Sequence, residues 1–313
     1  MRNHGAQSSV APLRKCLLRR PSWNRHSDHD WVDTWGYERE PDLKEAQDEH
    51  DKFADILRQL GVQVHYVKGQ AEGLCDSVFT CDSALITDEG AVILRSGKSV
   101  RRGESAVVEE ALQRLDIPII YRMEKPMTAD GGDFIWLRRD LLLAGRSYRT
   151  NASHGEEFIE FMADLGIEVK CMPVPHWTGK DDVMHLASFI SLVDYDLAVA
   201  YKKIMSVEMV QFLQGQGIEF VDVSDDEFDM GLGANVLAVG PGKCVMLKDY
   251  PRVRRDLEAA GVQVRVYTGE ELSHCMKGGA TCMTLDVLRE YEGDCRAAFP
   301  LQMQPTSGCT SAR

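Results

Sequence analysis

The residues of this chain that could do chemistry are gathered in five short polar segments, each followed by a very apolar run. Between them the segments carry a thiol, an imidazole, an amide and several carboxylates. A thiol beside a basic group can ionise near neutral pH, and the thiolate is a strong nucleophile. This set of side chains supports nucleophilic catalysis if the fold brings the segments together. The five segments are Asp76–Asp82, Asp130–Asp133, His185–Ser188, Gly231–Asn235 and Gly278–Cys282.

Cys282, His185 and Asp130 are the candidates for nucleophile, base and orienting group. Cys282 follows a pair of glycines, which permit an unusual turn and a close backbone approach. A cysteine–histidine pair needs a third group to hold the imidazole, and Asp130 could supply it. The alternatives are a buried structural cysteine, a core histidine and an ordinary tight turn at Asp130.

A second set of residues could bind a ligand with both charges. Asp76 and Asp82 bracket one loop, and two carboxylates suit a flat cation with several N–H donors, such as a guanidinium. Arg101 and Arg149 stand at predicted strand ends and could hold a carboxylate through two parallel hydrogen bonds. The alternatives are a solvated loop for the aspartates and surface charge for the arginines.

A sequence repeat, which we call the repeated phrase, occurs five times and must position these segments. Each copy consists of a helix-like stretch, then a glycine or an aspartate, and then a strand in which apolar and polar residues alternate. Glycine after a helical run is a helix-ending signal, because it adopts the left-handed conformation without a Cβ penalty. The polar segments follow the phrases at nearly constant distances, so five units closed in a ring would aim them at one axis. A doubly wound α/β sheet is the alternative. The phrases begin at Gly61, Asp116, Gly166, Gly217 and Gly261, about 50 residues apart.

The composition of the chain argues against several classes of protein. The 313 residues are 44% hydrophobic and 27% charged, as in a soluble globular protein, and no apolar run is long enough for a membrane helix. The net charge of −13 repels a phosphate backbone, which argues against nucleic acid. The nine widely spaced cysteines and the polar N-terminal residues indicate a reducing, cytoplasmic setting. The absence of a Cys-x-x-Cys pair argues against structural zinc.

The polar segments, taken in order with Ser99–Glu104 and Arg149–Asn151, resemble those of the guanidino-group-modifying enzymes. That superfamily includes dimethylarginine dimethylaminohydrolases, arginine deiminases and amidinotransferases, and the first of these is the most similar. The resemblance runs from about residue 60 to 290. It implies an α/β fold, the five-bladed α/β propeller called the pentein. We expect one such domain over residues 1–313, with flexible tails at 1–10 and 300–313.

The resemblance also implies a reaction and a set of roles. An Nω-methylated arginine would be hydrolysed to citrulline and an amine through a covalent thiouronium, without a metal or organic cofactor. The partner would be this small cationic guanidino substrate, and the protein would be a monomer or homodimer. The implied roles are nucleophile for Cys282, general acid and base for His185, orientation of His185 for Asp130, guanidinium binding for Asp76 and Asp82, and α-carboxylate binding for Arg101 and Arg149.

Two departures from the family pattern leave other functions open. Cys81 stands where dimethylargininases carry glutamate, and Ala187 stands where deiminases carry a further aspartate. The enzymatic alternatives are an arginine deiminase or dihydrolase and an amidinotransferase. The non-enzymatic ones are a guanidino-compound binding protein and a zinc-binding module on Cys275, Cys282 and His185. Trp31 and Trp35 could form a lid over the site or act as packing anchors.

Overall fold

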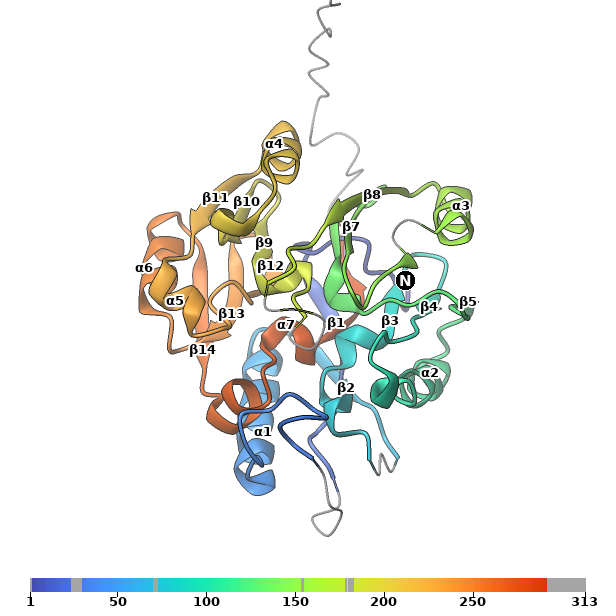
Figure 1. Cartoon of the computed structure of the whole chain (residues 1–313), viewed down its shortest axis with the longest axis horizontal. Helices are drawn as coiled ribbons and strands as arrows, with labels where there is room; N and C mark the ends of the chain where they lie inside the picture. Colours follow the sequence, from blue (N-terminus) through green and yellow to red (C-terminus); the bar gives the residue numbers. More distant parts are fainter. Residues whose placement is uncertain are drawn as a thin grey trace, which may run out of the picture.

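Five three-stranded sheets stand in a ring around a common axis (Figure 1). The computed structural model describes residues 2–23, 30–69, 73–152, 155–177, 179 and 183–291. In each sheet the middle strand is antiparallel to one neighbour and parallel to the other, and a helix on the outer rim connects the two parallel strands. The predicted five-bladed α/β propeller is therefore confirmed.

The blades share one order of elements: inner strand, middle strand, helix and outer strand. The first consists of β15 (Leu285–Arg289), β1 (Leu13–Leu18), α1 (Leu43–Gln59) and β2 (Gln63–Tyr66). The second consists of β3 (Ala84–Ile86), β4 (Ala91–Ile93), α2 (Glu104–Gln113) and β5 (Ile119–Arg122). The third consists of β6 (Phe134–Arg138), β7 (Leu141–Arg146), α3 (Glu156–Asp164) and β8 (Glu168–Pro173). The fourth consists of β9 (Ile190–Asp194), β10 (Leu197–Ala200), α4 (Val207–Gly215) and β11 (Glu219–Asp222). The fifth consists of β12 (Leu237–Gly240), β13 (Lys243–Leu247), α6 (Pro251–Ala259) and β14 (Gln263–Tyr267). Two short helices, α5 (Asp225–Asp229) and α7 (Ala280–Met283), lie outside this plan.

The helix ends confirm the repeated phrase. Four of the five rim helices are followed by glycine with a positive φ, for example +86° at Gly61 and +73° at Gly166. After α2 the same position is occupied by Asp116, whose φ is +57°. A left-handed residue lets the chain reverse from the helix into the outer strand, and this places each outer strand parallel to its middle strand.

Burial explains the apolar runs that follow the polar segments. The middle strands are covered on both sides, and four of the five residues of β13 are buried. The outer strands are covered on one side only, so β14 alternates between exposed and more buried positions. A strand with two covered faces reads as a continuous apolar run, whereas one with a single covered face alternates.

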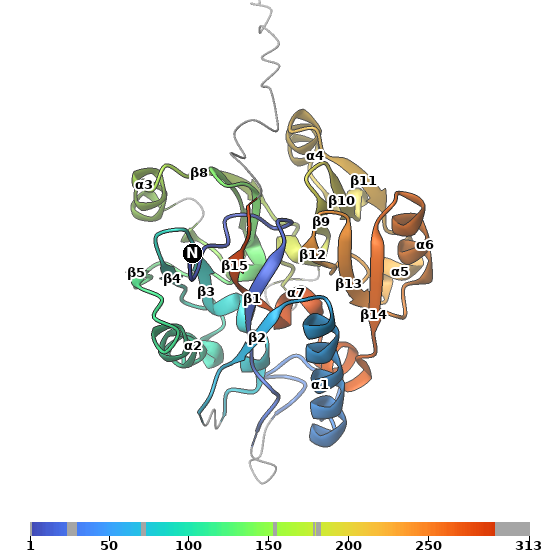
Figure 2. The same ribbon diagram turned by 180° about the vertical axis from the view of Figure 1, so that it is seen from behind.

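The ring closes through the two ends of the described chain, as the view from behind shows (Figure 2). β1 pairs antiparallel with β15, with Leu13 opposite Arg289 and Leu17 opposite Leu285. None of the helices within the described residues is both long enough and apolar enough to span a membrane.

The N-terminal residues are packed, contrary to the expected flexible tail at 1–10. The amide of Gly5 donates to Val287, and the carbonyl of Gly5 accepts from Arg289. Ala6 and Val10 are buried. These hydrogen bonds and the apolar burial hold the segment against β15. The second expected tail, 300–313, lies outside the described residues.

Candidate active site

The five polar segments meet around the axis of the ring, as the sequence predicted. Each lies immediately before the inner strand of its blade, and neighbouring segments contact one another. Residues 80–83 touch both 131–133 and 280–283, and residues 131–133 also touch 186–188. One composite site therefore draws on all five blades.

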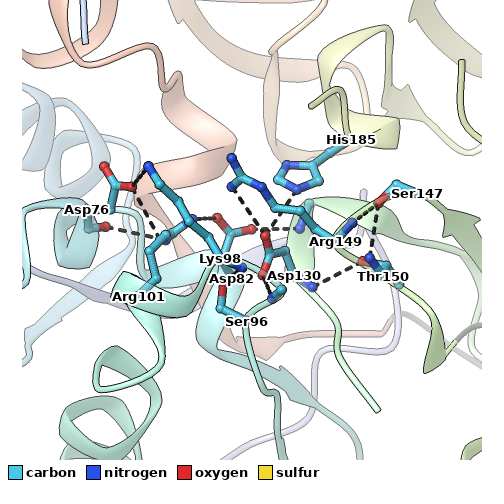
Figure 3. Close-up of polar contacts among 12 residues, drawn as sticks. Asp76, Asp82, Ser96, Lys98, Arg101, Asp130, Ser147, Arg149, Thr150 and His185 are labelled. Carbon is cyan, nitrogen blue, oxygen red and sulfur yellow. Dashed lines mark hydrogen bonds and ion pairs between the residues drawn. The ribbon is translucent and has the colours of Figure 1, made fainter. Parts of the chain in front are cut away.

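His185 and Asp130 form a pair at the centre of this site (Figure 3). The Nε2 atom of His185 lies 3.3 Å from Oδ2 of Asp130, whose side chain is fully buried. Burial opposes protonation of His185, but the carboxylates of Asp133, Asp130 and Asp82 outweigh it and raise the pKa of the imidazole. The pKa of Asp130 is lowered, because contacts with His185 and nearby arginines overcome the cost of burial. The arrangement favours a protonated imidazole beside an ionised carboxylate.

Asp133 and Gly132 set the position of the His185 segment. One carboxylate oxygen of Asp133 accepts from the amide of Leu186 at 3.1 Å, and the other accepts from the hydroxyl of Ser147 at 2.6 Å. The backbone of Gly132 lies so close to the imidazole that a Cβ there would be 2.9 Å from Nδ1 of His185. The second acidic residue of the Asp-Gly-Gly-Asp segment thus holds the histidine loop, while the first faces the imidazole.

Cys282 lies on α7 and is held by Asn235 from the fifth blade. The side-chain amide of Asn235 donates to Sγ of Cys282 at 3.3 Å, and its oxygen accepts from the amide of Thr281 at 3.0 Å. Burial, and next the negative charge of Asp82, raise the pKa of the Cys282 thiol to about 11. The thiol is therefore the main form near neutral pH in the structure as it stands.

Asp82 connects the cysteine side of the site with the histidine side. Its Oδ1 atom accepts from the amide of Gly132 at 2.9 Å, and its Oδ2 atom lies 2.7 Å from a guanidinium nitrogen of Arg101. Its charge contributes to raising the pKa of both Cys282 and His185. An anionic centre between a thiol and a protonated imidazole is suited to receive a cation.

Arg101 is enclosed by carboxylates, and its predicted role as a carboxylate binder stays a prediction. Its side chain is 3% exposed and lies 2.7 Å from Asp82, 2.9 Å from Glu104 and 3.5 Å from Asp76. Burying this many carboxylates requires a buried counter-charge, and Arg101 supplies it. Arg149 keeps an exposed part and lies 3.5 Å from Asp130.

Asp76 lies in the site but is already in contact with several donors. The hydroxyl of Tyr37 donates to its Oδ1 atom at 2.8 Å, and the ammonium of Lys98 donates to its Oδ2 atom at 3.2 Å. Sequence reasoning missed both of these residues, as well as the contact of Asn235 with the thiol. The one sequence feature that could have identified Lys98 as a site residue is its position directly before Ser99–Glu104. No sequence feature identified Tyr37.

The aromatic loop before α1 packs beside Asp76. Trp31 stacks on Tyr37 with ring centroids 5.7 Å apart, and Lys98 places its ammonium 5.3 Å from the ring of Trp35. The side chains of both Trp31 and Trp35 are buried. Their burial fits the second of the two predicted roles, that of packing anchors, and the role as a lid stays a prediction.

A cavity of about 100 Å³ lies next to the polar segments and is lined mainly by the inner strands. Cys81 and Ala187, the two departures from the family pattern, both line it.

The zinc-module alternative needs Cys275, Cys282 and His185 in one cluster. Within the described part of the chain no three histidine, cysteine or acidic side chains are grouped to hold a metal.

Comparisons with known proteins identify the family of the chain and agree with its fold. A family model described as "N,N dimethylarginine dimethylhydrolase, eukaryotic" matches residues 24–289. The dimethylarginine dimethylaminohydrolase of Pseudomonas aeruginosa is 28% identical over 246 residues, which are 78% of this chain and 89% of that protein. The one of Streptomyces coelicolor is 27% identical over 284 residues, which are 90% of this chain and 100% of that protein. A solved structure of a cysteine-to-serine variant of the Pseudomonas aeruginosa enzyme, complexed with citrulline, matches with a TM-score of 0.71 at 24% identity, over 88% of this chain and 99% of that one.

Proposed function

The chain belongs to the N,N-dimethylarginine dimethylhydrolase family, and from that premise we propose that it hydrolyses Nω-methylated arginine to citrulline and a methylamine. Family membership itself supports a guanidino-modifying hydrolase that acts on C–N bonds. Beyond family membership, we propose that the substrate is a methylated arginine and that the reaction passes through a covalent intermediate on Cys282. The observation that carries it is the position of Asp82, whose charge acts on both Cys282 and the His185–Asp130 pair.

The acidic groups account for binding of the cation. The guanidinium would lie against Asp82 between the thiol and the imidazole, with Asp76 as the second carboxylate. Carboxylates are matched to the planar N–H donors of a guanidinium, and in a buried setting such contacts are strong. The net charge of −13 adds a general attraction for a cationic ligand.

Binding of the cation also bears on the state of the nucleophile. In the empty site burial and Asp82 keep Cys282 protonated, with a pKa of about 11. A guanidinium beside Asp82 offsets that negative charge and adds a positive one near Sγ, so the thiol pKa falls. The thiol then releases its proton to solvent, and the thiolate forms where the substrate carbon is within reach.

The reaction follows in two steps. In the first, Sγ of Cys282 forms a bond to the guanidinium carbon, His185 gives its proton to the methylated nitrogen, and the C–N bond breaks to release the amine. In the second, the neutral His185 takes a proton from water, and the hydroxide adds to the thiouronium carbon. The C–S bond then breaks, and the O–H proton passes to the departing thiolate, which leaves citrulline and restores the thiol of Cys282. Asp130 holds the imidazole in place and stabilises its protonated form throughout.

Two observations favour this function over the other guanidino chemistries. The segment of His185 continues with Ala187, which is buried and carries no carboxylate where deiminases have one. The Pseudomonas aeruginosa relative was solved with citrulline, which is a product of hydrolysis at the guanidino carbon and not of amidino transfer or of a dihydrolase, both of which leave ornithine. An amidinotransferase would instead require an amine acceptor in place of water.

Replacement of Cys282 tests the proposal. We expect Cys282→Ser to reduce citrulline formation from asymmetric dimethylarginine by at least about a thousandfold, because serine lacks the acidity of the thiol. Cys171→Ser, on the outer strand β8, is the matched control and should retain normal turnover. Acid-quenched unaltered protein should also show a mass adduct on the peptide that contains Cys282. Normal turnover by Cys282→Ser would exclude the covalent mechanism.

A further inference from the structure

Arg19 is a buried cation that the proposed reaction does not use. It directly follows the last residue of β1 and is 2% exposed. One guanidinium nitrogen, Nη2, donates to the carbonyl of Gly69 at 3.1 Å. The Nε and Nη1 atoms are buried and have no hydrogen-bond partner among the described residues. A guanidinium carries five N–H donors, so most of those of Arg19 are unused.

The positive charge of Arg19 is also poorly compensated. Burial lowers the pKa of Arg19, and within the described part of the chain the one charge that opposes this effect is that of Glu104. The carboxylate of Glu104 is already engaged by Arg101, at 2.9 Å. A buried charge without a partner is strongly unfavourable, so buried charges in proteins are normally paired. Arg19 is therefore suited to receive an anion.

A pocket of about 390 Å³ lies directly beside Arg19. It is formed where the parallel strands β1 and β2 end, next to α1, and Figure 2 shows these three elements side by side. Ligand sites of α/β proteins commonly lie outside the carboxyl ends of parallel strands. The polar residues that line the pocket are Arg19, Arg20, Ser22, Asp51 and Tyr66, and none of them belongs to the central site.

The other polar groups of the pocket add donors around Arg19. Arg20 binds Asp51 through Nε and Nη2, each at 2.9 Å, and this ion pair offsets the charge of the one carboxylate in the pocket. The hydroxyl of Tyr66 accepts from Arg58 at 3.2 Å, so its own proton can go to a ligand, and Ser22 is exposed. Guanidinium donors bind phosphate oxygens in pairs, and hydroxyl donors can bind the remaining oxygens.

We propose that this pocket binds a phosphate group, with the guanidinium of Arg19 as its main contact. The ligand is inorganic phosphate or a phosphate monoester, because either presents several charged acceptor oxygens. A bound phosphate supplies a counter-charge for Arg19 and acceptors for its unused donors. The pocket is separate from the central site, so this inference does not depend on the proposed reaction.

Calorimetric titration of the whole protein tests the binding, with inorganic phosphate, glycerol 3-phosphate and acetate as probes. We expect saturable binding of phosphate, and a loss of affinity of about 10- to 100-fold in Arg19→Met, the range for losing hydrogen bonds to a charged group. Arg19→Lys keeps the charge without the planar fork and should have an intermediate affinity. Arg14→Met, on an exposed arginine of the same strand that pairs with Glu290, is the matched control and should bind normally. Tighter binding of glycerol 3-phosphate than of inorganic phosphate would identify the ligand as a monoester.

Stability gives a second readout that a purely structural arginine would not produce. In phosphate-free buffer Arg19→Met should be at least as stable to urea as the unaltered protein, because it removes a buried unpaired charge. Phosphate should raise the urea midpoint of the unaltered protein more than that of Arg19→Met, because only the former binds it tightly. The general effect of phosphate as a salt is common to both proteins and cancels in the comparison.

Three results would overturn the inference. They are the absence of saturable phosphate binding to the unaltered protein, equal phosphate affinities of that protein and Arg19→Met, and tighter binding of acetate than of phosphate. If Arg19→Met fails to fold, Arg19→Lys and the titration of the unaltered protein still decide the question. None of these measurements uses turnover, so they stand whether or not the proposed function does.

Discussion

At the scale of single residues, the site depends on the protonation of His185, which burial opposes and nearby negative charges favour. His185 is enclosed, which by itself would favour the neutral imidazole. Three carboxylates, those of Asp133, Asp130 and Asp82, reverse the outcome and raise the pKa of the imidazole. A raised pKa means that the protonated form persists at a higher pH than for an ordinary histidine. This protonated form is what the first step of the proposed reaction needs.

The pH dependence of the reaction follows from that shift. Activity that requires protonated His185 is present below its raised pKa and is lost as pH rises through it. Asp130→Asn removes one negative charge, so we expect the alkaline limb of kcat/KM to move about one pH unit lower, a change of about 1.4 kcal/mol. The measurement is a pH profile with asymmetric dimethylarginine, with Asp222→Asn on the surface as control. A limb that stays in place would remove Asp130 from its proposed role.

At the scale of elements, the turn from each rim helix into its outer strand requires a left-handed residue. Gly166 and Gly261 adopt positive φ without a Cβ penalty, whereas Asp116 adopts φ of +57° with a side chain. Asp116 is exposed, so little else constrains this position. The second blade therefore carries backbone strain that the other four avoid.

We expect Asp116→Gly to raise the free energy of unfolding by up to about 1 kcal/mol, because it relieves the left-handed strain. The reciprocal change, Gly166→Ala, should lower the free energy of unfolding by about 1 kcal/mol. No heavy atom lies within 4 Å of the position a Cβ would take at Gly166, so this loss reports on the backbone and not on a clash. Urea denaturation with unchanged m-values is the measurement. Destabilisation by Asp116→Gly would show that the aspartate side chain stabilises the turn.

The repeat could be predicted from the sequence because its signals are local. A glycine that ends a helix and an alternating strand that follows it are both read within a dozen residues. The pairing of Asp130 with His185 followed from the ring, since both stand at equivalent places in their blades. The partners of Asp76 could not be predicted, because Tyr37 reaches it through packing of the aromatic loop. The burial of Arg101 among carboxylates could not be predicted either, because residue type does not reveal how many carboxylates will surround a side chain.

At the scale of the whole molecule, the site exists only if the ring closes. Arg289 ties three parts of that closure together and is 2% exposed. Its guanidinium donates to the carbonyl of Ala11 at 2.6 Å, to the carbonyl of Ala238 at 2.8 Å, and to Asp286 at 2.7 Å. The N-terminal segment, the first blade and the fifth blade therefore meet at one side chain.

Arg289→Met should lower the free energy of unfolding by about 3 kcal/mol, because two buried carbonyls and Asp286 lose their donor. Arg255→Met, which removes an exposed ion pair with Asp256, should leave the urea midpoint unchanged. Equal midpoints for both variants would show that closure does not depend on Arg289.

The central claim is that this site hydrolyses a methylated guanidino group. It is tested most directly by mass spectrometry of parallel reactions of the purified protein with arginine, monomethylarginine and asymmetric dimethylarginine. We predict citrulline with methylamine from the second and citrulline with dimethylamine from the third, at rates well above that for arginine. Citrulline or ornithine formed from arginine alone, or no product from any of the three, would contradict the claim.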